Sequence, residues 1–268
     1  MDLATLIGII IAFLGLIVGF TADGGTIHAL LQGPAALIVF GGTIGATLAS
    51  TSMKRFIRIG KYLKIVFFRK VQEPQELIGQ LVQLATVARR EGILALEDKI
   101  EEFSDEFLKS GLRLVVDGVD PESVKNMMET ELSFIDERHE DAARLFEIAG
   151  GFAPTMGIIG TVMGLIHVLS NLQDIGKLGP EIATAFTATL YGVASANVLW
   201  FPIANKLKHR HRDEQLTREI MVEGVLSIQA GENPTILGQK LKAFLSPDER
   251  EEKSRNKAGD LNAETAQT

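Results

Sequence analysis

Four long runs without a charged residue constrain this chain more than any other feature. Each run is about 18 to 24 residues long. A helix that rises about 1.5 Å per residue needs roughly 20 residues to cross a hydrocarbon core of about 30 Å. The runs are residues 3–20, 34–53, 148–169 and 182–205. They predict an all-α integral membrane protein with four transmembrane helices.

The competing interpretation is that some of the runs are buried helices of a soluble protein. Uncharged runs of this length are uncommon in soluble cores, which argues against it for the first and last runs. Residues 34–53 are rich in Gly, Ser and Thr, so the membrane assignment is weakest there.

The positions of Lys and Arg predict the orientation of the spans. The links at 21–33 and 170–181 contain, between them, a single Lys or Arg residue, Lys177. Because cytoplasmic loops carry the excess of basic residues, we expect both chain ends and the segment between spans two and three in the cytoplasm. The basic clusters are Lys54, Arg55, Arg58, Lys61, Lys64, Arg69 and Lys70 after the second run, and Lys206, Lys208, Arg210 and Arg212 after the fourth.

The segment between the second and third runs also predicts helices. Apolar residues at helical spacing indicate one helix over 76–90 and another over 94–107. Asp120 before Pro121 is typical of a helix start. It predicts a long acidic helix over 122–146 that continues into the third span.

The part of the chain after the fourth run ends in a polar segment. Residues 213–245 show a further helical pattern, interrupted at 231–234, and the apolar-poor remainder is expected to be disordered. The expected domains are 1–53 with spans one and two, 54–147 as a helical cytoplasmic domain, 148–205 with spans three and four, 206–245 as cytoplasmic C-terminal helices, and 246–268 as a disordered tail.

The composition excludes several functional classes. The chain has no cysteine, and no nucleophile, metal cluster or phosphate-binding loop is persuasively placed, so we do not expect an enzyme. A formal net charge of −7 does not suggest a nucleic-acid partner. No Asp or Glu lies in any of the four runs. Since a cation pathway through a membrane usually needs an ionisable group, either the chain moves no ions or a partner supplies the carboxylate.

Two threonines share a depth in the expected membrane. Thr161 lies 8 residues from the end of the third run, and Thr189 lies 7 residues from the start of the fourth. At 1.5 Å per residue, both hydroxyls are roughly 11 to 12 Å below the outer boundary. A threonine in a membrane helix often bonds only the carbonyl four residues earlier, so depth alone leaves a structural role open.

Three glycine pairs have the spacing that allows membrane helices to approach closely. The pairs are Gly15 with Gly19, Gly41 with Gly45, and Gly160 with Gly164. They favour close helix packing, either within one subunit or between subunits.

Several longer motifs occur in a fixed order along the chain. They are 88–97 (ARREGILALE), 116–118 (VDG), 136–139 (DERH), 152–165 (FAPTMGIIGTVMGL), 188–192 (ATLYG) and 201–207 (FPIANKL). Together they resemble the MotA/PomA family of bacterial flagellar motor stator subunits. The similarity extends over roughly residues 1–245.

This resemblance implies an A subunit in the bacterial cytoplasmic (inner) membrane. Such a subunit forms a homopentamer around a dimer of MotB- or PomB-type B subunits, whose single membrane helix carries the aspartate that this chain lacks. Ion flow would rotate the A ring, and its cytoplasmic domain would push the rotor protein FliG. The resemblance implies no permanently bound cofactor, only Na+ or H+ as the coupling ion.

The resemblance also assigns residues to these steps. Thr161 and Thr189 would contribute to a transient Na+ pathway at the B-subunit interface. Na+ is favoured over H+ because sodium-type relatives carry Thr where Thr161 stands and proton-type relatives carry Ala. Pro154 and Pro202 would couple ion passage to a conformational change, while Arg89 and Glu97, helped by Arg90, would contact the rotor.

Three other functions stay open from the sequence. An ExbB/TolQ-like energy-transducing subunit belongs to the same superfamily, but those relatives have three spans. A self-contained secondary transporter would need its own buried ionisable residue or substrate site. A membrane scaffold without ion flow would need neither.

Overall fold

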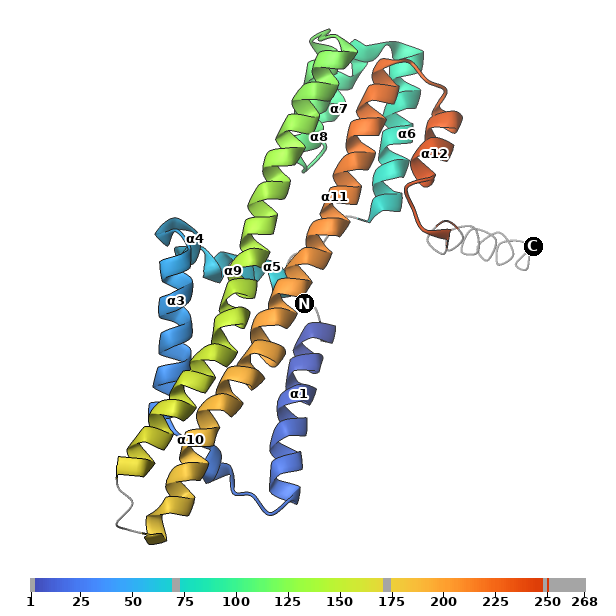
Figure 1. Cartoon of the computed structure of the whole chain (residues 1–268). Coiled ribbons are helices and arrows are strands. Elements are labelled where there is room, and N and C mark those ends of the chain that lie inside the picture. Colours follow the sequence, from blue (N-terminus) through green and yellow to red (C-terminus); the bar gives the residue numbers. More distant parts are fainter. Residues whose placement is uncertain (1–2, 69–72, 171–174, 248–249, 251–268) are drawn as a thin grey trace, which may run out of the picture. The chain divides into compact units, whose positions relative to one another are not determined.

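The computed structural model describes residues 3–68, 73–170, 175–247 and 250. Its regular elements are helices, and the described residues contain no strand (Figure 1). The polar tail expected at 246–268 lies almost entirely outside the described residues, as do Arg69 and Lys70. The elements are α1 Leu3–Ala22, η1 Ile27–Leu30, α2 Gly33–Ala36, η2 Leu37–Gly41, α3 Gly42–Ser50, α4 Met53–Ile57, α5 Ile59–Phe68, α6 Pro74–Glu91, η3 Ile93–Leu96, α7 Glu97–Ile100, α8 Glu106–Val116, α9 Pro121–Ser170, α10 Ile175–Ser195, η4 Ala196–Trp200, α11 Phe201–Gln229 and α12 Pro234–Lys242.

The chain divides into two compact units. The first unit consists of residues 1–70 and 137–211, and the second of residues 71–136 and 212–268, each as far as it is described. The long helices α9 and α11 each contribute residues to both units. The domain bounds expected relative to a membrane stay a prediction.

Four helical segments of the described chain are long and apolar enough to cross a membrane. They are Leu3–Ala22, Ile27–Ser50, a part of Pro121–Ser170 and a part of Leu178–Gln229. This agrees with the expected all-α membrane protein with four spans and a further helical region.

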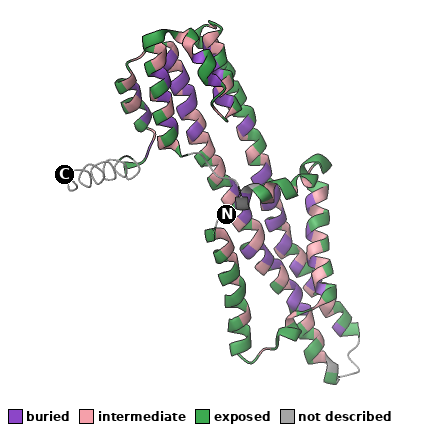
Figure 2. Cartoon of the chain, turned by 180° about the vertical axis from the view of Figure 1, so that it is seen from behind, coloured by how far each residue is buried: buried purple, intermediate pink, exposed green. Residues whose placement is uncertain are grey.

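Helix α1 buries none of its residues against the rest of the chain. Leu3 and Ile11 are each 63% exposed, and Figure 2 shows a largely exposed helix. A helix that is apolar on every side needs an apolar environment around it. Lipid or another subunit must therefore cover α1.

A small apolar cluster connects α5 with α9 and α11 in the first unit. Val66 and Ala204 are fully buried in it, together with Phe146, and Trp200 packs against them. Two ion pairs also occur in this unit: Arg55 Nη2 of α4 lies 2.6 Å from Asp141 Oδ2 of α9, and Lys208 Nζ of α11 lies 2.5 Å from Glu147 Oε1 of α9. Apolar contacts thus hold α5 to α9 and α11, and ion pairs hold α4 and α11 to α9.

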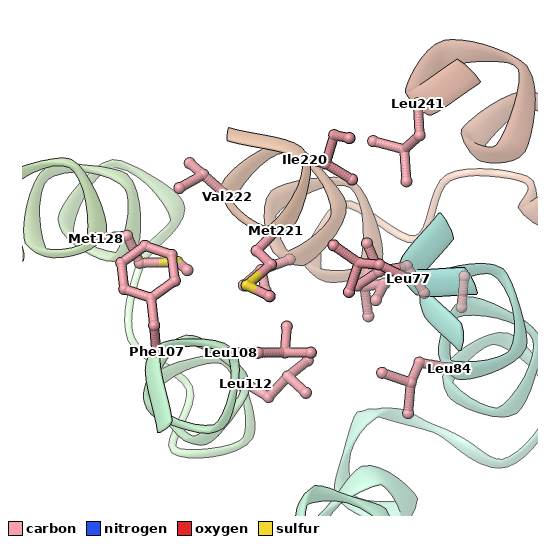
Figure 3. Close-up of a cluster of buried hydrophobic side chains, with 14 of the residues drawn as sticks. Leu77, Leu84, Phe107, Leu108, Leu112, Met128, Ile220, Met221, Val222 and Leu241 are labelled. Carbon is pink, nitrogen blue, oxygen red and sulfur yellow. The ribbon is translucent and has the colours of Figure 1, made fainter. Parts of the chain in front are cut away.

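The second unit has a larger apolar core. Side chains from α6, α8, α9, α11 and α12 meet there, as Figure 3 shows. Leu77, Leu112, Ile220 and Leu241 are fully buried. The helical spacing of apolar residues in these segments produces this shared core.

Side-chain caps begin α8, α9 and α12 in the second unit, whereas α6 and α7 begin without one. The Asp120 carboxylate accepts a hydrogen bond from the Ser123 amide at 3.0 Å, which confirms the expected start of the long helix α9. The prediction of one helix over 94–107 was wrong, because α7 ends at Ile100 and α8 begins only at Glu106. Asp105 explains the break, since its carboxylate accepts from the amides of Phe107 and Leu108 and caps a new helix.

Candidate functional site

Two hydroxyl groups from different helices meet in the first unit. The Oγ1 atoms of Thr161 on α9 and Thr189 on α10 lie 2.5 Å apart. Thr161 Oγ1 is also 3.1 Å from the carbonyl oxygens of both Gly157 and Ala185, and Thr189 Oγ1 is 3.5 Å from that of Gly157. The structure thus brings together the two threonines that share a depth in the sequence.

This threonine cluster has more oxygen lone pairs than protons. Each hydroxyl has one proton to donate, whereas each carbonyl oxygen can only accept. Both side chains are partly exposed, so they are accessible from outside the chain. Hydroxyl and carbonyl oxygens in such a group can replace water around a hard cation, but they carry no charge to neutralise it.

Small residues let α9 and α10 approach closely enough for this contact. A Cβ atom at Gly157 would lie 2.9 Å from the carbonyl oxygen of Ala188, and one at Gly164 would lie 2.6 Å from Cβ of Ala185. Gly160, where a Cβ would lie 2.7 Å from Cβ of Ala188, is equally crowded. Glycine at these positions therefore fixes the separation of the two helices that carry the threonines.

The other glycine pairs have a different environment. Around Gly15, Gly19 and Gly45, a Cβ atom would meet nothing within 4 Å beyond its own helix backbone in the described structure. The pair Gly160 and Gly164 thus serves packing within the chain. The open positions leave room for closer contact with a neighbouring chain.

The segments that precede Pro154, inside α9, and Pro202, at the start of α11, lie beside each other. Gly150, four residues before Pro154, faces the ring of Phe201, which directly precedes Pro202, and a Cβ at Gly150 would lie 2.8 Å from that ring. Proline has no amide proton and crowds the carbonyl four residues earlier. For Pro202 that carbonyl belongs to a residue of the π-helical segment η4, whereas α9 stays α-helical at Pro154.

Arg89, Arg90 and Glu97 are exposed around one tight turn of the second unit. Arg89 and Arg90 lie in the last turn of α6, and Glu97 begins α7. Gly92 between them has φ +90° and ψ 162°, a conformation that glycine adopts far more readily than other residues. Within the described residues, neither Arg89 nor Glu97 has an ion-pair partner within 4.0 Å. Such charges contribute little to stability and are available to a partner.

The short helix that begins with Glu97 is held by ion pairs at its other end. Glu101 follows α7, and its carboxylate lies 2.5 Å from Arg113 Nη2 and 3.4 Å from Lys109 Nζ. Hydrogen bonds from Arg113 and then Lys109 lower the pKa of Glu101 below its ordinary value. Lys109 and Arg113 belong to α8, so these contacts tie the turn carrying Glu97 to the core of its unit.

Tyr191 is a contact residue that the sequence argument did not single out. Its hydroxyl donates to the carbonyl oxygen of Leu30 and accepts from the amide of Gln32 at 3.0 Å. Its ring also lies 6.2 Å from that of Phe40. Tyr191, two residues after Thr189 on α10, therefore holds the link between the first two spans by hydrogen bonds.

Two family models match this chain over most of its length. Residues 6–92 match the motility protein A N-terminal model, and residues 99–220 match the MotA/TolQ/ExbB proton channel family. The chain is 41% identical to motility protein A of Bacillus subtilis over 251 residues, which is 93% of each protein.

The chain belongs to the MotA family.

Other members of the MotA family agree with this assignment. Chemotaxis protein PomA of Vibrio alginolyticus is 39% identical, with 93% of this chain and 98% of that protein covered. The fold matches the structure of MotAB from C. jejuni with a TM-score of 0.89 and 34% identity, over 92% of this chain and 97% of that chain. It matches the flagellar MotAB stator complex from Bacillus subtilis with a TM-score of 0.87 and 41% identity, over 91% and 97%.

Membership in the MotA family confirms the resemblance read from the motifs. It also makes the chain a member of a channel family and not an enzyme. The N-terminal match favours the motility branch over an ExbB/TolQ-like subunit, as does the presence of four long apolar helices.

Proposed function

We propose that this chain is the A subunit of an ion-driven flagellar stator that requires a MotB- or PomB-type B subunit. Two solved relatives of this fold are MotAB complexes. The observation that carries the proposal is the threonine cluster. It supplies oxygen ligands for a cation within the uncharged runs 148–169 and 182–205, which contain no Asp or Glu. A partner's aspartate is the charge that completes it.

The proposed coupling ion is Na+. Thr161 and Thr189 each contribute a hydroxyl oxygen, and Gly157 and Ala185 contribute the nearby carbonyls. Na+ needs several oxygen ligands, whereas a proton needs only the partner's carboxylate. The ion binds transiently, and no permanent cofactor is required.

Proton coupling is the second candidate. The 2.5 Å contact between the two hydroxyls satisfies both threonines without a cation. In that case the cluster holds α9 to α10, and the partner's carboxylate alone carries the ion.

The work comes from the membrane potential. One elementary charge that crosses about 100 mV releases roughly 2.3 kcal/mol. Pro154 and Pro202 then serve as the conformational step, because proline lacks an amide proton and weakens the helix around it, inside α9 and where η4 meets α11. The π-helical segment before Pro202 is the part already displaced from regular α geometry.

The second unit engages the rotor. Arg89, Arg90 and Glu97 form the contact surface, and FliG is the proposed partner. Charges of both signs on an exposed turn steer and orient a partner of complementary charge. In this arrangement the second unit and both chain ends are cytoplasmic, in agreement with the basic residues that flank spans two and four.

Self-association as a homopentamer would cover the apolar faces that the chain leaves open. Helix α1 buries no residue, and Gly15, Gly19 and Gly45 have space for a close neighbour. Five copies around a B-subunit dimer provide both the channel wall and the ring that turns.

Charge reversal at the turn tests the rotor assignment. The experiment expresses Arg89→Glu and Glu97→Lys with the cognate B subunit in a motile host that lacks its own stators. Stall torque is expected to fall several-fold while the amount of complex in the membrane stays at the wild-type level. Lys125→Glu, an exposed reversal elsewhere in the second unit, is the matched control and should retain torque. An unchanged stall torque in both turn variants would remove the assignment.

A further inference from the structure

We infer that the helix pair α4 and α5 is a binding surface for anionic phospholipid headgroups. This pair, the basic collar, consists of Met53–Ile57 and Ile59–Phe68 and begins directly after α3 ends at Ser50. Its position places it where the second apolar segment leaves the membrane. The inference depends on that segment crossing the membrane and not on the coupling ion or the rotor.

One side of α5 is buried in the first unit. Ile59, Tyr62, Leu63 and Val66 follow the spacing of one helix face, and all four pack in the apolar cluster with Phe146. Val66 is fully buried. The helix is therefore fixed in its rotation about its own axis.

The opposite side of α5 carries exposed lysines. Lys61 and Lys64 are three residues apart, and at about 100° per residue both lie roughly opposite the buried face. Lys54 and Arg58 are exposed in the preceding turns. In the part of the chain that the structure describes, none of these four bases has a carboxylate within 4.0 Å.

Arg55 provides a contrast within the same segment. Its guanidinium lies 2.6 Å from the Asp141 carboxylate and so belongs to the contact that holds α4 to α9. The other four bases contribute no such contact. Four positive charges concentrated within eleven residues repel one another unless an external anion is present.

Exposed apolar side chains lie next to these charges. Met53 is 58% exposed and Ile57 is 74% exposed, one helical turn apart on α4. Lys54 and Arg58 are their immediate neighbours in sequence. A helix that combines an exposed apolar pair with bases suits the boundary between acyl chains and headgroups, where each group meets a matching environment.

The positive charge of the basic collar favours lipids whose headgroups carry a net negative charge. A zwitterionic headgroup carries its own ammonium group beside the phosphate, so it offers the collar little net attraction. An anionic headgroup such as phosphatidylglycerol has no compensating cation. Basic segments beside a membrane span bind anionic lipid surfaces by this electrostatic attraction, which salt screens.

Lipid competition on the purified complex tests the inference. The full chain with its B subunit is incubated in detergent with equal amounts of phosphatidylglycerol and phosphatidylcholine, and native mass spectrometry counts the lipids retained. We expect a clear excess of phosphatidylglycerol. The triple variant Lys54→Gln, Lys61→Gln, Lys64→Gln should reduce that excess at least about fivefold, the scale expected from the loss of a single base near an anionic surface.

A charge-matched variant controls for net charge. Lys99→Gln, Lys125→Gln, Lys242→Gln removes three exposed lysines of the second unit and should keep the wild-type lipid ratio. Lys54→Arg, Lys61→Arg, Lys64→Arg should also keep it. If the triple glutamine variant does not assemble, the wild-type complex tests the inference at increasing NaCl concentration. Its ratio of retained phosphatidylglycerol to phosphatidylcholine must then fall, because salt screens the attraction.

Any of three results would overturn the inference. The first is an equal phosphatidylglycerol excess in both glutamine variants, and the second is a wild-type excess that is independent of salt. The third is loss of subunit association in the collar variant with an unchanged lipid ratio, because a second copy of the chain would then cover the surface.

Discussion

The hydroxyl oxygens of Thr161 and Thr189 lie 2.5 Å apart although 28 residues separate them in the chain. Their helices approach this closely because Gly157, Gly160 and Gly164 leave no side chain between them. Two independent features of the sequence, hydroxyls at one depth and glycines at helical spacing, thus describe one contact.

Replacing Thr161 by alanine should affect ion use far more than folding. The loss of a hydrogen bond between neutral groups costs about 1 kcal/mol, whereas an interaction with a charged group is worth about 1.5–3 kcal/mol. The external Na+ concentration that gives half-maximal swimming speed should therefore rise about tenfold or more. Thr161→Ser keeps the oxygen and should stay near wild type. Identical Na+ dependence in all three proteins would argue against a ligand role.

Gly164→Ala should push α9 and α10 apart. The added Cβ would lie 2.6 Å from Cβ and 3.0 Å from Cα of Ala185, so the backbone must move. Overpacking of this kind costs about 1–3 kcal/mol. Thermal unfolding of the purified complex should show a lower midpoint, and Na+-driven speed should fall as well. Gly179→Ala, at a position of α10 with open space, is the control. Equal midpoints for the two variants would mean that the helices are not closely packed.

Gly92→Ala should destabilise the turn that carries the proposed rotor charges. A non-glycine residue at φ +90° and ψ 162° costs about 1–3 kcal/mol of strain. Gly79→Ala is its counterpart, since Gly79 lies inside α6 with open space and alanine there should stabilise by roughly 0.5–1 kcal/mol. Unfolding midpoints of the two variants should therefore shift in opposite directions. A shift in the same direction would contradict the turn geometry.

The sequence predicted those parts of the fold that depend on local spacing and charge. The uncharged runs correctly predicted the four apolar helices, and Asp120 followed by Pro121 correctly predicted the start of α9. Residue counting placed Thr161 and Thr189 at one level because a helix rises by a constant amount per residue.

What the sequence did not predict depends on contacts between distant residues or on competing local signals. The bond from the Tyr191 hydroxyl to Leu30 joins residues 161 positions apart, and no local pattern indicates it. The break before α8 follows from Asp105, whose capping side chain outweighed the apolar spacing that favoured a continuous helix. The π-helical segment η4 precedes Pro202, for which the resemblance implied a conformational role, but no pattern in the sequence predicted a π-helix there.

The most direct test of the proposed Na+-driven stator is swimming speed against external Na+ at fixed pH. The host lacks its own stators and carries this chain with its cognate B subunit, and phenamil serves as the sodium-channel blocker. The account predicts that speed rises with Na+ to a plateau and that phenamil lowers it. A speed that is constant over the whole Na+ range and insensitive to phenamil would contradict it.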